Sequence, residues 1–223
     1  MSALLTLSTL CLEVSGAVHK RADVCGLRYG CSVWTLSRPT PDTVRAFIDA
    51  QRALPFSYDA VGATRDDRAP SGFAHDHNRQ LLGRGAACFA AACDGIRAWQ
   101  MFPAPLAWIE PPQIPISVGE VAGVVIHAAG VWWLNAARIV YVIDEPRRFG
   151  FAYGTLPGHA ERGEERFSVE WLDDDSVWYD LRAFSQPRYW MARLGNPIVR
   201  ALQRRFVRMS KAAMERAAAT SSS

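Results

Sequence analysis

The side chains best suited to chemistry lie close together, in the segment that runs from residue 159 to residue 165. This segment carries one imidazole and three carboxylic acids, at His159, Glu161, Glu164 and Glu165. Neighbouring carboxylates and a histidine can displace one another's pKa, so that one group donates a proton while another accepts one. Such a set would suit a hydrolase or a cyclase. The same residues also fit the solvated tip of a hairpin, because Pro157-Gly158 precedes them and shapes a tight turn.

A shared metal ion is a second chemistry that these side chains allow. His75-x-His77 and His159-x-Glu161 each place two common zinc ligands one residue apart. The two pairs are distant in sequence, and the first falls in a long polar stretch that predicts a loop. No metal and no other cofactor is therefore expected.

Two adjacent strands are predicted to position the 159–165 segment. In residues 149–155, large side chains alternate with glycine and alanine, which predicts a strand with one bulky face and one close-packed face. In residues 164–171, the same alternation places Glu165 among apolar side chains and Glu164 on the opposite face. An enzyme would require Tyr153, Glu165 and His159 to converge in one pocket, where they would act as acid, base or orienting groups.

The rest of the chain predicts an α+β domain. Helices are expected over residues 41–54, 83–102 and 189–218, the last kinked or restarted at 195–197 by Gly-Asn-Pro. A strand is expected over 58–64, a polar loop over 65–83, and further strands over 106–110, 118–127, 139–144 and 177–185. Short links between strands require antiparallel pairing, and the apolar stripe of the last helix requires a surface that covers it. The predicted fold is therefore a curved antiparallel sheet of about six to seven strands gripping the long C-terminal helix, with two helices before the main run of strands.

Several motifs of the chain resemble those of one known family. They are FSYDAVGAT at 56–64, YVIDE at 141–145, FGFAYGTLPGHAERGEERF at 149–167 and RLGNP at 193–197, with shorter matches at 82–85, 99–102 and 177–185. Over about residues 54–214 the chain resembles the DUF1990 family, also called UPF0548. The order of its elements resembles the helix-grip fold of START and Bet v 1-like proteins. The resemblance implies a fold but no reaction.

The motifs also divide the chain. Residues 1–37 lie before the region of resemblance and lack a sustained hydrophobic period, so they are expected to form a poorly ordered N-terminal arm. Residues 38–218 are expected to form a single domain, and residues 219–223 a disordered tail.

A cavity between the sheet and the C-terminal helix is the expected functional site. Its candidate ligand-binding residues are aromatic residues of the strands and apolar residues of the helix: Tyr141, Phe151, Tyr153, Tyr179, Leu202 and Phe206. The expected partner is a small apolar or amphipathic molecule. An enzyme that uses His159, Glu165 and Tyr153 in the same cavity is the alternative.

The C-terminal helix also carries a basic face, formed by Arg200, Arg204, Arg208 and Lys211. This face is either simply solvated or a contact with an anionic membrane surface. Nucleic acid is not an expected partner, because the face lacks interleaved aromatic residues and the net charge of the chain is only +3.

Cysteine usage and hydropathy bear on the compartment. The five cysteines are odd in number and show no C-x-x-C spacing, which favours a reduced protein. No apolar run reaches the roughly 18 residues that a membrane span needs, and the N-terminus lacks the basic region of a signal peptide. The expected location is cytoplasmic, and the sequence leaves the oligomeric state open.

Overall fold

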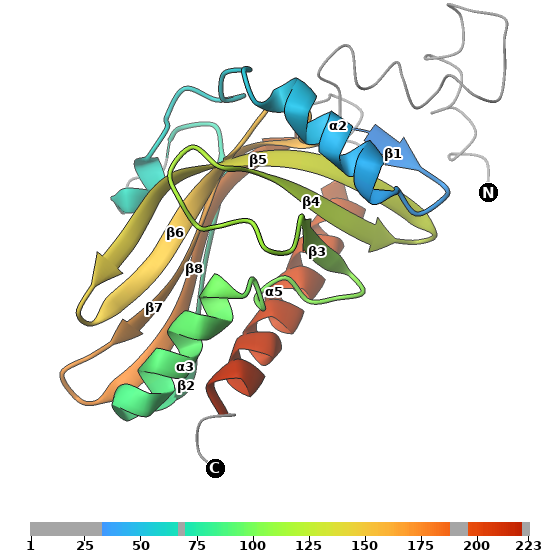
Figure 1. The fold of residues 1–223 in the computed structure, drawn as a ribbon. Helices are drawn as coiled ribbons and strands as arrows, with labels where there is room; N and C mark the ends of the chain where they lie inside the picture. Colours follow the sequence, from blue (N-terminus) through green and yellow to red (C-terminus); the bar gives the residue numbers. More distant parts are fainter. Residues whose placement is uncertain (1–32, 67–69, 188–195, 220–223) are drawn as a thin grey trace, which may run out of the picture.

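The computed structural model describes residues 33–66, 70–187 and 196–219, and it confirms the α+β fold (Figure 1). The strands are β1 (Val33–Thr35), β2 (Ala74–Arg84), β3 (Ala107–Glu110), β4 (Val121–Ala128), β5 (Val131–Glu145), β6 (Arg148–Thr155), β7 (Glu161–Trp171) and β8 (Ser176–Pro187). The helices are α2 (Pro41–Gln51), α3 (Gly85–Arg97) and α5 (Asn196–Ala219), with a 3₁₀ turn η1 (Ala63–Arg65).

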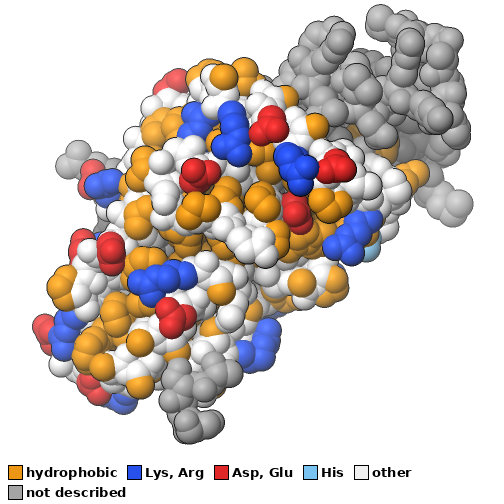
Figure 2. All heavy atoms as spheres, in the orientation of Figure 1, with side chains coloured by type: hydrophobic (Ala, Val, Ile, Leu, Met, Phe, Trp, Pro, Cys, Tyr) orange, Lys and Arg blue, Asp and Glu red, His pale blue; other side chains and the backbone are white. Residues whose placement is uncertain are grey.

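One curved antiparallel sheet carries the fold. Its strand order is β2-β8-β7-β6-β5-β4-β3, and the short β1 pairs with β5 as an eighth strand. Helices α3 and α5 lie across the concave face, whereas α2 covers part of the other face (Figure 1). The grip of the sheet on the C-terminal helix is thus the architecture that the sequence predicts. The face seen in Figure 2 shows charged side chains of both signs interspersed with apolar ones.

Helix α2 begins where the sequence places its capping residues. Thr40 is extended and its hydroxyl oxygen accepts a hydrogen bond from the Thr43 amide at 3.2 Å, while Pro41 occupies the first helical position. The helix buries Phe47 and Ile48 against β4 and β5. These residues form the smaller of two hydrophobic cores, which packs α2 against β4 and β5 on the convex side of the sheet.

The larger core lies under α3 and α5. Ile96 of α3 and Met214 of α5 are fully buried together with Phe151 and Phe167 of the central strands. The two helices approach closely at Gly95, where an added Cβ would lie 2.9 Å from the Cβ of Ala217. Helix α5 is therefore an integral wall of the domain.

Two predicted elements between α2 and α3 are wrong. Residues 58–64 form turns that lead into η1 instead of a strand, and Gly62 there adopts a left-handed conformation with φ of 88°. The predicted polar loop at 65–83 contains the edge strand β2, which pairs with β8 along its length. Over residues 75–80 its side chains alternate between exposed and half-buried, but both sets are polar, so no hydrophobic alternation marks this part of the strand.

The chain ends fall partly outside the description. Residues 1–32 of the predicted arm and residues 220–223 of the predicted tail lie outside the described residues. Within the arm, Val33–Thr35 forms β1 and pairs with Leu134 to Trp132 of β5. Residues 189–195 of the predicted C-terminal helix also lie outside the described residues, and the rest of it forms α5, from Asn196 through Ala219.

Candidate functional site

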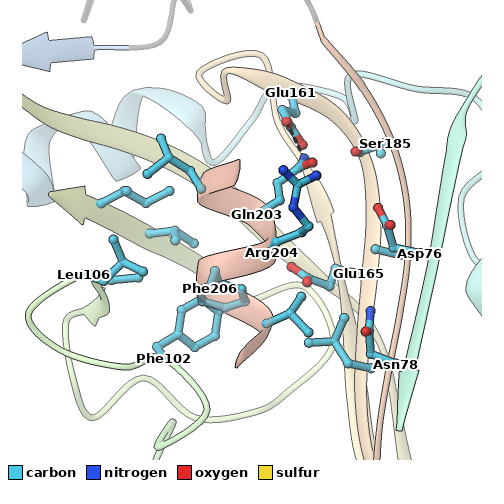
Figure 3. A pocket seen from close by; sticks show the side chains of 18 of the residues that line it. Asp76, Asn78, Phe102, Leu106, Glu161, Glu165, Ser185, Gln203, Arg204 and Phe206 are labelled. Atoms are coloured by element: carbon cyan, nitrogen blue, oxygen red, sulfur yellow. Dashed lines mark hydrogen bonds between the residues drawn. The ribbon is translucent and has the colours of Figure 1, made fainter. Parts of the chain in front are cut away.

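A cavity of about 960 Å³ lies between α5 and the concave face of the sheet. Most of its wall is apolar, with contributions from Phe102, Leu106, Ile126, Trp133, Leu202 and Phe206. Figure 3 shows Phe102, Leu106 and Phe206 grouped together, while the labelled acidic side chains lie along the strands on the other side of α5. The cavity therefore has an apolar end and a polar wall.

A tyrosine–glutamate pair is the central polar feature of this cavity. Tyr153 of β6 and Glu165 of β7 stand opposite each other in the ladder, and both line the cavity. The Tyr153 hydroxyl donates a hydrogen bond to Glu165 Oε2 at 2.6 Å. The hairpin thus brings together two of the three predicted catalytic residues.

Burial changes the acidity of both groups. Removal of the Glu165 carboxylate from water raises its pKa from 4.5 to about 7, and the nearby acids Glu161 and Asp76 add to the rise. Burial also raises the pKa of Tyr153 well above 10.0, and its bond to Glu165 acts in the same direction. At neutral pH, Glu165 can therefore both give and take a proton, while Tyr153 stays a neutral hydrogen-bond donor.

Two further acids connect the strands to α5. Glu161 of β7 accepts a hydrogen bond from the Gln203 side chain at 2.7 Å, and Asp76 of β2 forms an ion pair with Arg200 at 3.0 Å. Burial raises the pKa of Glu161. These contacts hold the first turns of the described helix against β2 and β7.

His159 lies in the turn before β7 and lines the same cavity. Its Nδ1 accepts a hydrogen bond from the backbone amide of Glu161 at 3.0 Å. Since Nδ1 accepts, the neutral ring carries its proton on Nε2. All three predicted catalytic residues therefore border one cavity, and two of them, Tyr153 and Glu165, are joined by a hydrogen bond.

Glu164, the fourth member of the predicted acid–base group, contributes its carboxylate to the opposite face. It is 2% exposed and accepts hydrogen bonds from the Tyr58 hydroxyl at 2.7 Å and from the Gly62 amide at 2.7 Å. The Thr64 amide donates to it at 3.0 Å, and the Thr64 hydroxyl is hydrogen-bonded to it as well. We call Tyr58, Gly62, Thr64 and Glu164 the clamp, because they fasten residues 58–64 to β7.

A buried arginine, Arg166, lies next to the clamp. Arg166 donates a hydrogen bond to the Thr64 carbonyl oxygen at 3.0 Å and forms an ion pair with Asp180 at 2.8 Å. His77 contacts the other carboxylate oxygen of Asp180 at 2.7 Å. Because His77 faces this outer side while His159 borders the cavity, the His75/His77 and His159/Glu161 pairs lie on different sides of the sheet and are not placed to share one metal ion. The described residues contain no group of three or more histidine, cysteine or acidic side chains that could hold a metal.

The predicted ligand-binding residues divide into two sets. Tyr153, Leu202 and Phe206 line the cavity, whereas Tyr141, Phe151 and Tyr179 are not part of its wall. Phe151 is covered by Trp99, at 4.8 Å between ring centroids, and Tyr179 is covered by α5 through a 2.8 Å hydrogen bond to Ser210.

Tyr141 lies on the convex face because the alternation of β5 is interrupted. The register passes from Ile139 opposite Tyr153 to Tyr141 opposite Ala152, so a bulge at Val140 turns the following side chains over. The Tyr141 hydroxyl is consequently hydrogen-bonded to Thr64 at 2.8 Å, next to the clamp.

The basic face of α5 borders the cavity instead of lying apart from it. Arg200, Arg204, Arg208 and Lys211 are all lining residues, and Arg204 and Arg208 are exposed. Arg200 forms an ion pair with Asp76 of the cavity wall. No helix of the described residues is long and apolar enough to cross a membrane.

The pH dependence of stability is expected to report on Glu165. Its pKa is higher in the folded protein than in the unfolded chain, so the folded state holds more protons between about pH 4.5 and 7, and stability falls as the pH rises through this window. Glu165→Gln keeps an acceptor for Tyr153 and removes that fall, which amounts to at most about 3 kcal/mol. Urea unfolding of both proteins at about pH 5 and 8 measures it. If the free energy of unfolding changed equally with pH in the wild type and in Glu165→Gln, the raised pKa could not belong to Glu165.

Comparison with known proteins finds relatives that span most of the chain. The family model described as "Domain of unknown function (DUF1990)" matches residues 57–213. A UPF0548 protein of Dictyostelium discoideum is 34% identical over 193 residues, covering 76% of this chain and 88% of that protein. A UPF0548 protein of Deinococcus radiodurans is 36% identical over 199 residues, covering 83% and 99%. Among solved structures, that of Ara h 8.0201 has a TM-score of 0.46 at 15% identity, covering 67% of this chain and 99% of that one. The matched region includes the Tyr153–Glu165 pair and the whole clamp.

Proposed function

The chain belongs to the DUF1990 (UPF0548) family. From the geometry of its cavity, we propose that it binds a small amphipathic ligand between the sheet and α5. The observation that carries this proposal is the Tyr153–Glu165 pair inside an otherwise apolar cavity of about 960 Å³. Small-molecule sites are typically apolar clefts of about 300–1,000 Å³ with a few convergent polar groups that orient the ligand. The apolar end would hold the body of the ligand and the pair would hold its polar group.

Filling the cavity from α5 tests this proposal. We expect the neutral apolar dye Nile red to bind the wild-type protein and Leu202→Trp to weaken that binding at least about tenfold, because the larger side chain occupies the cavity. Ala201→Trp is the matched control, since Ala201 is exposed and does not line the cavity. Fluorescence titration of the three proteins, with a melting curve for each, measures the effect. Absence of dye binding to the wild type, or equal weakening by both variants, would count against a ligand site here.

An enzyme that acts in the same cavity is the second candidate, and the short Tyr153–Glu165 contact favours it. A carboxyl group with a pKa of about 7 is suited to proton transfer at neutral pH, and His159 borders the same space. Hydrolysis of p-nitrophenyl esters of varied chain length by the wild type, lost in Glu165→Gln, would support it. Equal rates for the two proteins would reject a role for Glu165 in that reaction.

The basic residues at the cavity border favour one further role, a peripheral contact with anionic membranes. Arg204 and Arg208 are exposed beside the cavity, so the surface that touches the lipid would also be the surface through which a ligand passes. Sedimentation with phosphatidylserine vesicles at low salt tests this role. Equal sedimentation of the wild type and an Arg204→Ala/Arg208→Ala variant would reject it.

A further inference from the structure

We infer that the ligand carries a cationic amine, which the Glu165 carboxylate receives, on an apolar body that fills the other end of the cavity. This inference rests on the proposed ligand binding and adds the chemical class of the ligand.

Glu165 is a buried acid of the cavity wall that is held by a single neutral hydroxyl. Glu164 and Glu215 also line the cavity without an ion pair, but Glu164 is held by several hydrogen bonds on the other face of the strand and Glu215 is exposed. Asp76 is neutralised by Arg200 at 3.0 Å, and Glu161 is bound by Gln203 at 2.7 Å with Arg200 also acting on it. Glu165 takes part in no ion pair of the described residues, and its hydrogen bond comes from the neutral hydroxyl of Tyr153. A carboxylate withdrawn from water without a counterion carries a desolvation cost that an arriving cation would offset.

Two neighbouring acids act on Glu165. Glu161 on the same strand and Asp76 on β2 both disfavour the ionised form of its carboxyl group and so raise its pKa. The basic residues of α5 that border the cavity are Arg200, held by Asp76, and Arg204, Arg208 and Lys211. Among the described residues none of the four forms an ion pair with Glu165, so its carboxyl group has no counterion although the border of the cavity is basic.

The rings around the pair suit a cation with an apolar body. Tyr153 packs against Phe167 and Phe102, with ring centroids 5.7 Å and 6.2 Å apart, and Phe102 packs against Phe206 at 5.6 Å. Aromatic faces attract ammonium groups and also offer apolar area. An anionic ligand would instead have to place its charge beside Glu165, or leave it at the basic border.

Three probes with the same alkyl chain separate the classes: decylamine, decanol and decanoate, each measured by displacement of Nile red. We expect decylamine to bind at least about tenfold more tightly than decanol, and decanoate to bind most weakly. Glu165→Gln should remove the preference for the amine over decanol. Glu170→Gln is the matched control, because Glu170 lies on the same strand and pairs with Arg79 and Arg148 on the outer face.

Calorimetry can detect protons released when the amine binds, and no such release is expected if the role of Glu165 is only structural. At about pH 6 the amine should expel a proton from Glu165, so the heat of binding should change with the ionisation enthalpy of the buffer in the wild type but not in Glu165→Gln. Equal affinities for the three probes, or a preference for decanoate, would overturn the inference and leave ligand binding intact. Failure of every probe and of the dye to bind would reject the proposed function itself.

Discussion

Glu164→Gln is expected to lower the free energy of unfolding by about 3–5 kcal/mol, a large part of the roughly 5–15 kcal/mol that stabilises a domain. The buried carboxylate of Glu164 accepts hydrogen bonds from two backbone amides and from the hydroxyls of Tyr58 and Thr64. A glutamine amide group would turn its own N–H donors toward some of these donors and leave them unsatisfied. Urea unfolding at about pH 8 measures the loss.

The control is the same substitution one residue along the chain. Glu165→Gln, on the cavity side of β7, should be as stable as the wild type or more stable at that pH, because its buried carboxylate lacks a counterion. A loss below about 1 kcal/mol for Glu164→Gln would show that the clamp does not hold residues 58–64 in place.

Met214→Ala is expected to cost about 2–5 kcal/mol, because Met214 is fully buried between α5, α3 and the sheet. Phe206→Ala on the same helix should cost less than half as much, although it removes a larger side chain. Phe206 borders the cavity and is only partly buried, so part of its surface has no protein contact to lose. Equilibrium unfolding of the two variants gives the comparison.

Arg205→Ala serves as the control for α5, since Arg205 is exposed on the helix and should change stability by less than about 0.5 kcal/mol. If Met214→Ala unfolds no more readily than Arg205→Ala, the helix does not contribute to the core. If instead Phe206→Ala costs as much as Met214→Ala, the cavity wall at Phe206 is as tightly packed as the core.

Strong hydrophobic alternation made the central hairpin predictable, and with it the meeting of Tyr153 and Glu165. Strand β2 carried no such signal over residues 75–79, because its inward residues Asp76 and Asn78 form the polar wall of the cavity and its outward residues there, two histidines and an arginine, are polar as well. Because these residues line a cavity, they are polar, and the hydrophobic alternation that would have predicted the strand is missing. The bulge at Val140, which moves Tyr141 to the other face, likewise has no signature in composition or spacing.

The clamp could not be inferred from local sequence for a different reason. Tyr58, Gly62 and Thr64 satisfy a carboxylate 100 to 106 positions away in the chain, and only the assembled sheet brings them together. The resemblance to the family marked both segments, at 56–64 and 149–167, without indicating that they touch.

Glu164 and Glu165 have different roles on opposite sides of β7. This limits the insertions and deletions that the turn between β6 and β7 can tolerate. Insertion or deletion of one residue in the turn at 156–160 would shift the register of β7 against β6 by one position. One of the two glutamates would then take the place of the other, on one of the two faces of the strand. Arg166 has no such substitute, since a slip in either direction would transfer its guanidinium to the apolar side now occupied by Glu165 and Phe167. Natural variation in the length of this turn should therefore come in steps of two residues, or not at all.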